Sequence, residues 1–121
     1  MERKSILIVD DSPIIVERLQ NMLEGSKNIG PIRKAGDYPS AVRQLAESQP
    51  EIVLLDINLP GRSGIALLQY IKSVYPSIIV IMVSNRAEES YRRICLKMGA
   101  NYFIDKSKEI EQVPSIISTF F

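Results

Sequence analysis

The chain has 121 residues, of which 45% are hydrophobic and 24% are charged, so it can form one domain with a single apolar core. Its net charge of +1 gives no general attraction to nucleic acid or to an anionic membrane surface. Because the sequence contains no histidine, the chain itself can form neither a histidine metal site nor a phosphohistidine.

Several further protein classes are also disfavoured by the sequence. The N-terminal apolar run ends at Asp10 and is too short for a signal peptide or a membrane span, so we expect a cytoplasmic protein without membrane insertion. The single cysteine, Cys95, excludes an internal disulfide and is expected in the core. No predicted helix carries a basic stripe, so direct binding to nucleic acid is not expected.

Apolar runs and amphipathic segments alternate along the chain and predict five strands, each followed by a helix. The strands are expected at residues 6–9, 32–35, 52–56, 78–83 and 102–104. The helices are expected from Ser12 to Gly25, around 39–46, at 64–75, at 88–98, and in a last segment that begins near Pro114 and runs through Phe120. Such alternation is typical of an α/β fold with a parallel sheet and helices on both faces.

The run 52–56 is the best-defined strand of the chain. It is apolar up to its last residue, Asp56, and is bounded by Pro50 and Pro60. An uninterrupted apolar run of this length predicts a strand that is buried on both faces. Asp56 is therefore expected at the carboxyl edge of the sheet, where open α/β folds bind their ligands.

Polar side chains follow the other strong strands in the same way. Asp10 and Asp11 follow the first strand, Ser84 follows the fourth and Lys106 follows the fifth. Together with Asp56, they are expected to share one shallow cleft, where three carboxylates repel one another unless they bind a cation. Oxygen ligands without histidine or cysteine favour a hard ion, and a shallow site that retains water favours Mg²⁺ over Ca²⁺.

With these motifs in place, the whole chain resembles a response-regulator receiver domain of two-component signalling, similar to the single-domain chemotaxis-type regulators. The resemblance rests on Ile8-Val9-Asp10-Asp11-Ser12, on Leu54-Leu55-Asp56-Ile57-Asn58-Leu59-Pro60-Gly61, on Gly64, on Val83-Ser84 and on Phe103-Ile104-Asp105-Lys106. It implies a flavodoxin-like sheet with strand order 2-1-3-4-5 and a single receiver domain over residues 1–121.

The resemblance also implies roles for the acidic residues. Asp56 would be the nucleophile that accepts a phosphoryl group and becomes an acyl phosphate. Asp10 and Asp11 would hold Mg²⁺ together with an oxygen of Asp56 and the main-chain carbonyl of Asn58. The ion would offset the negative charge that otherwise repels an incoming phosphoryl group.

Three further residues would act on the phosphoryl group or respond to it. Ser84 would donate a hydrogen bond to one phosphoryl oxygen, and Lys106 would pair with another. Phe103 would be the switch aromatic, which turns inward when Ser84 moves and thereby changes a protein-binding surface; ordinary packing is the alternative for this side chain. Tyr102 is expected to point to the opposite face of the sheet.

The implied partners follow from the absence of histidine. The phosphohistidine donor would belong to a sensor histidine kinase or a phosphotransfer protein, with a small-molecule phosphodonor as the other source. A downstream protein would bind the switched surface, and a homodimer could form through the face built by the helix at 88–98, the strand at 102–104 and the final helix. The domain would assist its own phosphorylation and dephosphorylation without being a turnover enzyme.

Two departures from the family pattern and two alternative functions stay open. Ser107 replaces a common proline, so the Lys106–Ser107 bond is expected to be trans. Asn85 stands where the family often has a small residue and is expected to change the rate of dephosphorylation, and Asn58 and Arg86 should also alter that rate. One alternative is a receiver-fold binding platform that no longer depends on phosphate. The other is a Mg²⁺-dependent phosphohydrolase with an aspartyl nucleophile, which the adjacent pair Asp10-Asp11 and the absence of a cap domain disfavour.

Overall fold

The computed structural model describes residues 3–120; Met1, Glu2 and Phe121, which the predicted domain includes, lie outside the described residues. Its five strands form one parallel sheet in the order β2-β1-β3-β4-β5. These strands are β1 (Lys4–Val9), β2 (Ile29–Ala35), β3 (Ile52–Leu55), β4 (Ile79–Ser84) and β5 (Tyr102–Asp105). The α/β fold and the predicted strand order 2-1-3-4-5 are confirmed.

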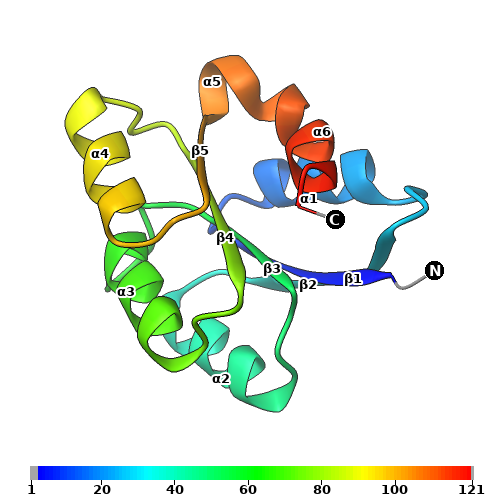
Figure 1. Cartoon of the computed structure of the whole chain (residues 1–121), viewed down its shortest axis with the longest axis horizontal. Coiled ribbons are helices and arrows are strands. Elements are labelled where there is room, and N and C mark those ends of the chain that lie inside the picture. Colours follow the sequence, from blue (N-terminus) through cyan, green and yellow to red (C-terminus); the bar gives the residue numbers. More distant parts are fainter. Residues whose placement is uncertain (1–2, 121) are drawn as a thin grey trace.

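Helices cover both faces of the sheet (Figure 1). They are α1 (Pro13–Leu23), α2 (Tyr38–Glu47), α3 (Gly64–Val74), α4 (Glu89–Lys97), α5 (Lys106–Glu109), the 3₁₀ turn η1 (Ile110–Gln112) and α6 (Val113–Ser118). α1 and α6 pack on one face, while α2, α3 and α4 pack on the other. The predicted layered architecture is therefore confirmed.

Alternation along the strands divides the core into two clusters. In β3, Val53 and Leu55 pack toward α2, α3 and α4, whereas Ile52 and Leu54 pack toward α1 and α6. All four side chains are almost completely buried, as expected for an inner parallel strand. The sheet thus holds the residue that follows β3 at a rigid edge between the two layers.

Most element boundaries lie within two residues of the sequence-based expectation, and two differences are larger. β2 begins at Ile29 and includes Pro31, although the strand was expected only from residue 32. β2 pairs with β1 alone, and an edge strand tolerates a proline because one side needs no ladder hydrogen bonds. The weak apolar character of residues 29–31 reflects this half-covered position.

The second difference is a helical turn that the sequence did not predict. Lys106 starts α5, and η1 then leads into α6, whose start at Val113 agrees with the late start inferred from Pro114. Asp105 caps α5 by accepting a hydrogen bond from the Ser107 amide at 3.0 Å. Four residues are too short for a periodic pattern, so only this cap could have indicated the turn.

Smaller expectations agree with the structure. Cys95 is buried, and burial raises the pKa of its thiol. No peptide bond within residues 3–120 is cis, so the Lys106–Ser107 bond is trans as expected. Within that same range, no helix combines the length and the apolar character needed to cross a membrane.

Candidate functional site

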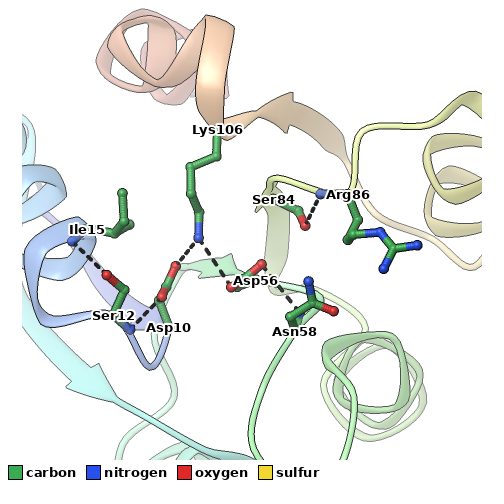
Figure 2. Close-up of polar contacts among 8 residues, drawn as sticks. All are labelled: Asp10, Ser12, Ile15, Asp56, Asn58, Ser84, Arg86 and Lys106. Atoms are coloured by element: carbon green, nitrogen blue, oxygen red, sulfur yellow. Dashed lines mark hydrogen bonds and ion pairs between the residues drawn. The ribbon is translucent and has the colours of Figure 1, made fainter.

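Five of the predicted site residues meet at the carboxyl edge of the sheet (Figure 2): Asp10, Asp56, Asn58, Ser84 and Lys106. Asp10 follows β1 and donates its amide N–H to the Ala35 carbonyl at 3.0 Å, while the amide of Asp56 donates to the Val9 carbonyl at 3.0 Å. These bonds continue the ladder by one residue beyond β1 and β3. The backbone of both acids is therefore fixed by the sheet, although their side chains lie in the cleft.

Gly64 allows helix α3 to begin directly against Asp56. A Cβ atom at residue 64 would lie 1.8 Å from the Asp56 carbonyl oxygen, which no side chain can tolerate. The Gly64 amide donates to the Ile57 carbonyl at 2.7 Å, and Ser63 caps the helix by accepting from the Ile65 amide. Glycine is required here because the loop after β3 turns back so closely, and this turn sets the position of Asp56.

Lys106 bridges two of the acids. Its ammonium group donates to Asp10 Oδ2 at 2.7 Å and to Asp56 Oδ2 at 3.2 Å, and the three side chains are at most 8% exposed. Burial raises the pKa of Asp56; the Lys106 charge opposes this effect and the Asp10 charge adds to it. One ammonium group thus compensates two buried carboxylates only in part.

The acids also have the arrangement of a cation site. One carboxylate oxygen from each of Asp10, Asp11 and Asp56 lies within 4.8 Å of the others, and Asp11 is exposed to solvent. The second oxygen of Asp10, Oδ1, accepts from the Ser12 amide at 2.8 Å, which fixes the orientation of that carboxylate. Three oxygen donors at an open edge fit Mg²⁺, as the sequence led us to expect.

A surface groove runs beside this site, between α1 and the turn from β2 to α2. It is lined by Asp10, Asp11, Pro13, Val16, Glu17, Gln20, Lys34, Gly36 and Asp37. Because two of the clustered acids form part of its wall, solvent and ions can reach the site from this side. The predominance of acidic groups over the single lysine favours cations there.

Asn58 and Ser84 flank Asp56. The Asn58 amide lies 3.4 Å from Asp56 Oδ1, and the ligand role of its main-chain carbonyl stays a prediction. Ser84 is fully buried, and its hydroxyl accepts a hydrogen bond from the Arg86 amide at 3.0 Å. Figure 2 shows that Lys106 and Ser84 approach Asp56 from different sides. A group on Asp56 would therefore meet a cation on one side and a hydroxyl on the other.

Phe103 lies inward in this structure. Its side chain is 1% exposed and belongs to the core cluster beneath α2, α3 and α4, whereas Tyr102 is 40% exposed. The Arg92 guanidinium lies 5.0 Å from the centre of the Phe103 ring and donates to the Phe103 carbonyl at 3.1 Å. Arg92 also approaches Glu109 Oε1 at 3.6 Å, so it connects α4 to β5 and α5.

The sequence did not predict the contact of Arg92 with Phe103 or the contacts of the Arg86 side chain. The Arg86 guanidinium lies 4.8 Å from the centre of the Tyr91 ring, donates to the Tyr91 hydroxyl at 3.2 Å and approaches Glu88 at 3.4 Å. A spacing of five residues is not a helical neighbour distance, and the Arg92–Phe103 pair joins two different elements. No periodic signal could therefore have identified either contact.

Comparisons with known proteins agree with this fold. A model of the response regulator receiver domain matches residues 6–118. Fimbriae Z protein of Salmonella typhimurium is 31% identical over 93% of this chain and 54% of its own length, and the DNA-binding transcriptional activator EvgA of Escherichia coli is 29% identical over 92% and 54%. This chain thus spans about half the length of these curated relatives.

A solved structure gives the same picture. The receiver domain of NtrX from Brucella abortus is 30% identical and superposes with a TM-score of 0.83 over 94% of this chain and 95% of that chain. The family model covers nearly all of the sequence, and the acids, the hydroxyl and the lysine lie together at the expected edge. The chain therefore belongs to the response regulator receiver domain family, whose members act as phospho-accepting switches in two-component signalling.

Proposed function

We propose that Asp56 is the phosphoryl acceptor of this receiver domain. The observation that carries the proposal is the Asp56 carboxylate itself, which is 5% exposed, bridged to Asp10 by Lys106, and gathered with two other acids at the sheet edge. This carboxylate lies among like charges and has one cationic neighbour. It is therefore suited to accept a phosphoryl group when Mg²⁺ binds beside it and offsets the added negative charge.

In the proposed reaction, an Asp56 oxygen forms a bond to phosphorus, and the phosphorus–nitrogen bond of a partner's phosphohistidine breaks. The bonding electron pair returns to the imidazole nitrogen, which leaves an acyl phosphate on Asp56. Water later attacks the phosphorus, releases inorganic phosphate and regenerates the carboxylate. A small-molecule acyl phosphate would react in the same way, with a carboxylate as the leaving group.

Several groups would support this transfer. Asp10, Asp11, Asp56 and the main-chain carbonyl of Asn58 would hold Mg²⁺, which supplies charge neutralisation and orients the phosphoryl group when bound. Lys106 already lies 3.2 Å from Asp56 Oδ2, so it needs little movement to pair with a phosphoryl oxygen. Such preorganised cationic donors stabilise charge that develops during transfer.

Ser84 and Phe103 are the proposed switch pair. Ser84 would donate a hydrogen bond from its hydroxyl to the phosphoryl group, which would fix the end of β4. Phe103 already lies inward beneath Arg92, and phosphorylation would increase the population of this buried position. The surface formed by α4, β5 and the helical segment after it would then present one shape to a partner.

The cellular setting is part of the same proposal. Residues 1–121 would form a single receiver domain in the cytoplasm, phosphorylated by a sensor histidine kinase or a phosphotransfer protein. A downstream protein, or a second copy of the chain, would bind the surface of α4 and β5. The domain would use up one phosphoryl group per activation and would not turn over a small substrate.

The test measures phosphate on the intact protein. Wild type and Asp56→Asn are incubated with Mg²⁺ and acetyl phosphate, and mass spectrometry follows the mass increase of one phosphoryl group. Wild type should gain the group, and Asp56→Asn should not, because its amide is a poor nucleophile.

Asp37→Asn is the matched control. Asp37 lies at the same edge but caps α2 by accepting from the Ser40 amide at 2.9 Å, and it is not one of the clustered acids. It should be phosphorylated like wild type. Equal phosphorylation of wild type and Asp56→Asn, or none in wild type, would contradict the proposal, and the second result would favour a phosphate-independent binding platform.

A further inference from the structure

The loop between β4 and α4 is fastened at two points. At its start, the Arg86 amide donates to the buried Ser84 hydroxyl at 3.0 Å. At its end, the Arg86 side chain is held by the first turn of α4, where it stacks on Tyr91 and donates to the Tyr91 hydroxyl at 3.2 Å. Arg86 is thus a single residue whose backbone contacts the site and whose side chain contacts a helix.

The amide contact determines what the Ser84 hydroxyl can do. A hydroxyl has one proton to donate and two lone pairs that accept. Since the Arg86 amide occupies one lone pair, the hydroxyl proton must point away from that amide. The other side of the hydroxyl faces Asp56 in Figure 2, so the contact prepares Ser84 to donate toward a group on Asp56.

The side-chain contacts determine how firmly the amide is held. Arg86 is 45% exposed, and its ion pair with the 56% exposed Glu88 is weak by itself because both groups remain in water. Tyr91 provides a firmer support, since it is partly buried and packs against the core cluster that includes Phe103. The stacking at 4.8 Å therefore connects the loop to the core rather than to another mobile side chain.

We propose that Tyr91, acting through Arg86, is a positioning residue for the Ser84 hydroxyl and thereby raises the rates of both phosphorylation and dephosphorylation of Asp56. The inference rests on the proposed role of Asp56. Both reactions place charge on the same phosphoryl oxygens, so a correctly oriented hydroxyl accelerates each of them. Without the Tyr91 ring, Arg86 is free to move, the loop relaxes and Ser84 loses its orientation.

The chain offers a matched control for this contact. The Arg62 guanidinium stacks on Tyr38 with 4.2 Å to the ring centre, and Tyr38 packs against the same core cluster as Tyr91. Tyr38→Ala removes the same kind of stacking, together with an edge contact to Tyr70. No hydrogen bond from Arg62 to Ser84 is recorded among the described residues, so this variant leaves the hydroxyl oriented.

The experiment compares wild type, Tyr91→Ala, Tyr91→Phe and Tyr38→Ala by intact mass. Phosphorylation by acetyl phosphate is measured at increasing Mg²⁺ concentrations. These data give the maximal phosphorylation rate and the Mg²⁺ concentration at which the rate is half of that maximum. Removal of the donor then gives the hydrolysis rate. Tyr91→Ala should lower both rates roughly threefold to tenfold, because one oriented donor is disturbed but not deleted. The half-saturating Mg²⁺ concentration should stay within about twofold, since the acids are untouched.

The other variants separate orientation from loss of structure. Tyr91→Phe keeps the ring beneath Arg86 and should restore most of both rates, while Tyr38→Ala should match wild type. If Tyr91→Ala does not fold, Arg86→Ala carries the test, because it removes the same contact from an exposed position and should give the same slower rates. The double variant Tyr91→Ala/Arg86→Ala should be no slower than the slower of its two single variants, because both substitutions remove the same contact.

Three results would overturn the inference while leaving the role of Asp56 intact. The first is that Tyr91→Ala keeps the wild-type rates. The second is that Tyr91→Ala is phosphorylated faster, because a freed Arg86 reaches the phosphoryl group. The third is that Tyr38→Ala loses as much rate as Tyr91→Ala. A wild type that takes up no phosphate would contradict the proposed function instead, so the two failures are distinguishable.

Discussion

The two ends of the sheet differ in how their charged groups are compensated. At the carboxyl edge, Asp10, Asp56, Ser84 and Lys106 are the buried polar and charged residues found within residues 3–120. Two carboxylates there share one ammonium group, and an exposed third acid, Asp11, lies close by. Charge at this edge is thus left without full compensation inside the chain.

At the amino edge, by contrast, charged side chains form hydrogen bonds with neutral groups. Glu51 precedes β3 and accepts hydrogen bonds from the Ser5 amide at 2.6 Å and the Ser5 hydroxyl at 2.5 Å. Lys72 donates to the Ile78 carbonyl at 2.6 Å and to the Asn101 side-chain oxygen at 2.9 Å. Each of these contacts joins two segments of the fold.

This difference in charge compensation indicates that the carboxyl edge is a binding site and that the amino edge supports the structure. The amino edge uses its polar groups to connect strand starts, so removing one should cost stability. The carboxyl edge concentrates negative charge that the fold does not need, which is a stability cost that ligands can offset. The predictions below test this contrast, beginning with the largest expected effect.

Replacing each lysine by methionine should separate the two edges. Lys106→Met should lower the rate of phosphorylation by acetyl phosphate by about 100-fold or more, because a preorganised cation at the phosphoryl group is lost. Lys72→Met should leave that rate within about twofold of wild type and instead lower the free energy of unfolding by about 1–2 kcal/mol, because the Ile78 carbonyl loses its donor. Intact-mass kinetics and urea unfolding measure the two effects, and a similar loss of phosphorylation in both variants would remove the contrast.

Mg²⁺ should stabilise the protein through the carboxyl edge alone. At ten times its dissociation constant, the ion should raise the free energy of unfolding by about 1.4 kcal/mol. Asp11→Asn should remove most of this increase because it deletes one of the clustered carboxylates. Urea unfolding with Mg²⁺ and with a chelator gives the measurement. Glu51→Gln is the control from the other edge and should respond to the ion as wild type does; an undiminished increase in Asp11→Asn would refute the site.

The smallest expected effect concerns acid stability at the amino edge. Hydrogen bonds from Ser5, chiefly that of its hydroxyl, hold the pKa of Glu51 below its ordinary value. A carboxyl with a lowered folded-state pKa contributes stability above its unfolded pKa and loses it as the pH falls through the folded value. Glu51→Gln should therefore flatten the decline in stability between about pH 5 and about pH 3, which urea midpoints at several pH values would show. An unchanged decline would mean that these hydrogen bonds persist in the unfolded chain or contribute nothing.

The sequence allowed most of the fold and the membership of the site to be predicted. Strand runs such as 52–56 are local patterns, and a parallel sheet places whatever follows its strands at one edge, so Asp10, Asp56, Ser84 and Lys106 could be brought together without coordinates. The strand order came from the family resemblance. Local patterns predicted two elements poorly. The start of edge strand β2 contains Pro31 and lacks a clear apolar pattern, and α5 has too few residues for a helical period.

By itself, then, the sequence determined which chemical groups occur and at which strand ends, because apolar periodicity and residue type are properties of short segments. Only the tertiary structure decided how they pair: Lys106 with two acids, Arg92 over Phe103, and Arg86 on Tyr91. These contacts depend on side-chain rotamers and on the distance between elements that approach only when the core packs. The ion pairs of Lys106 also offset part of the repulsion between Asp10 and Asp56.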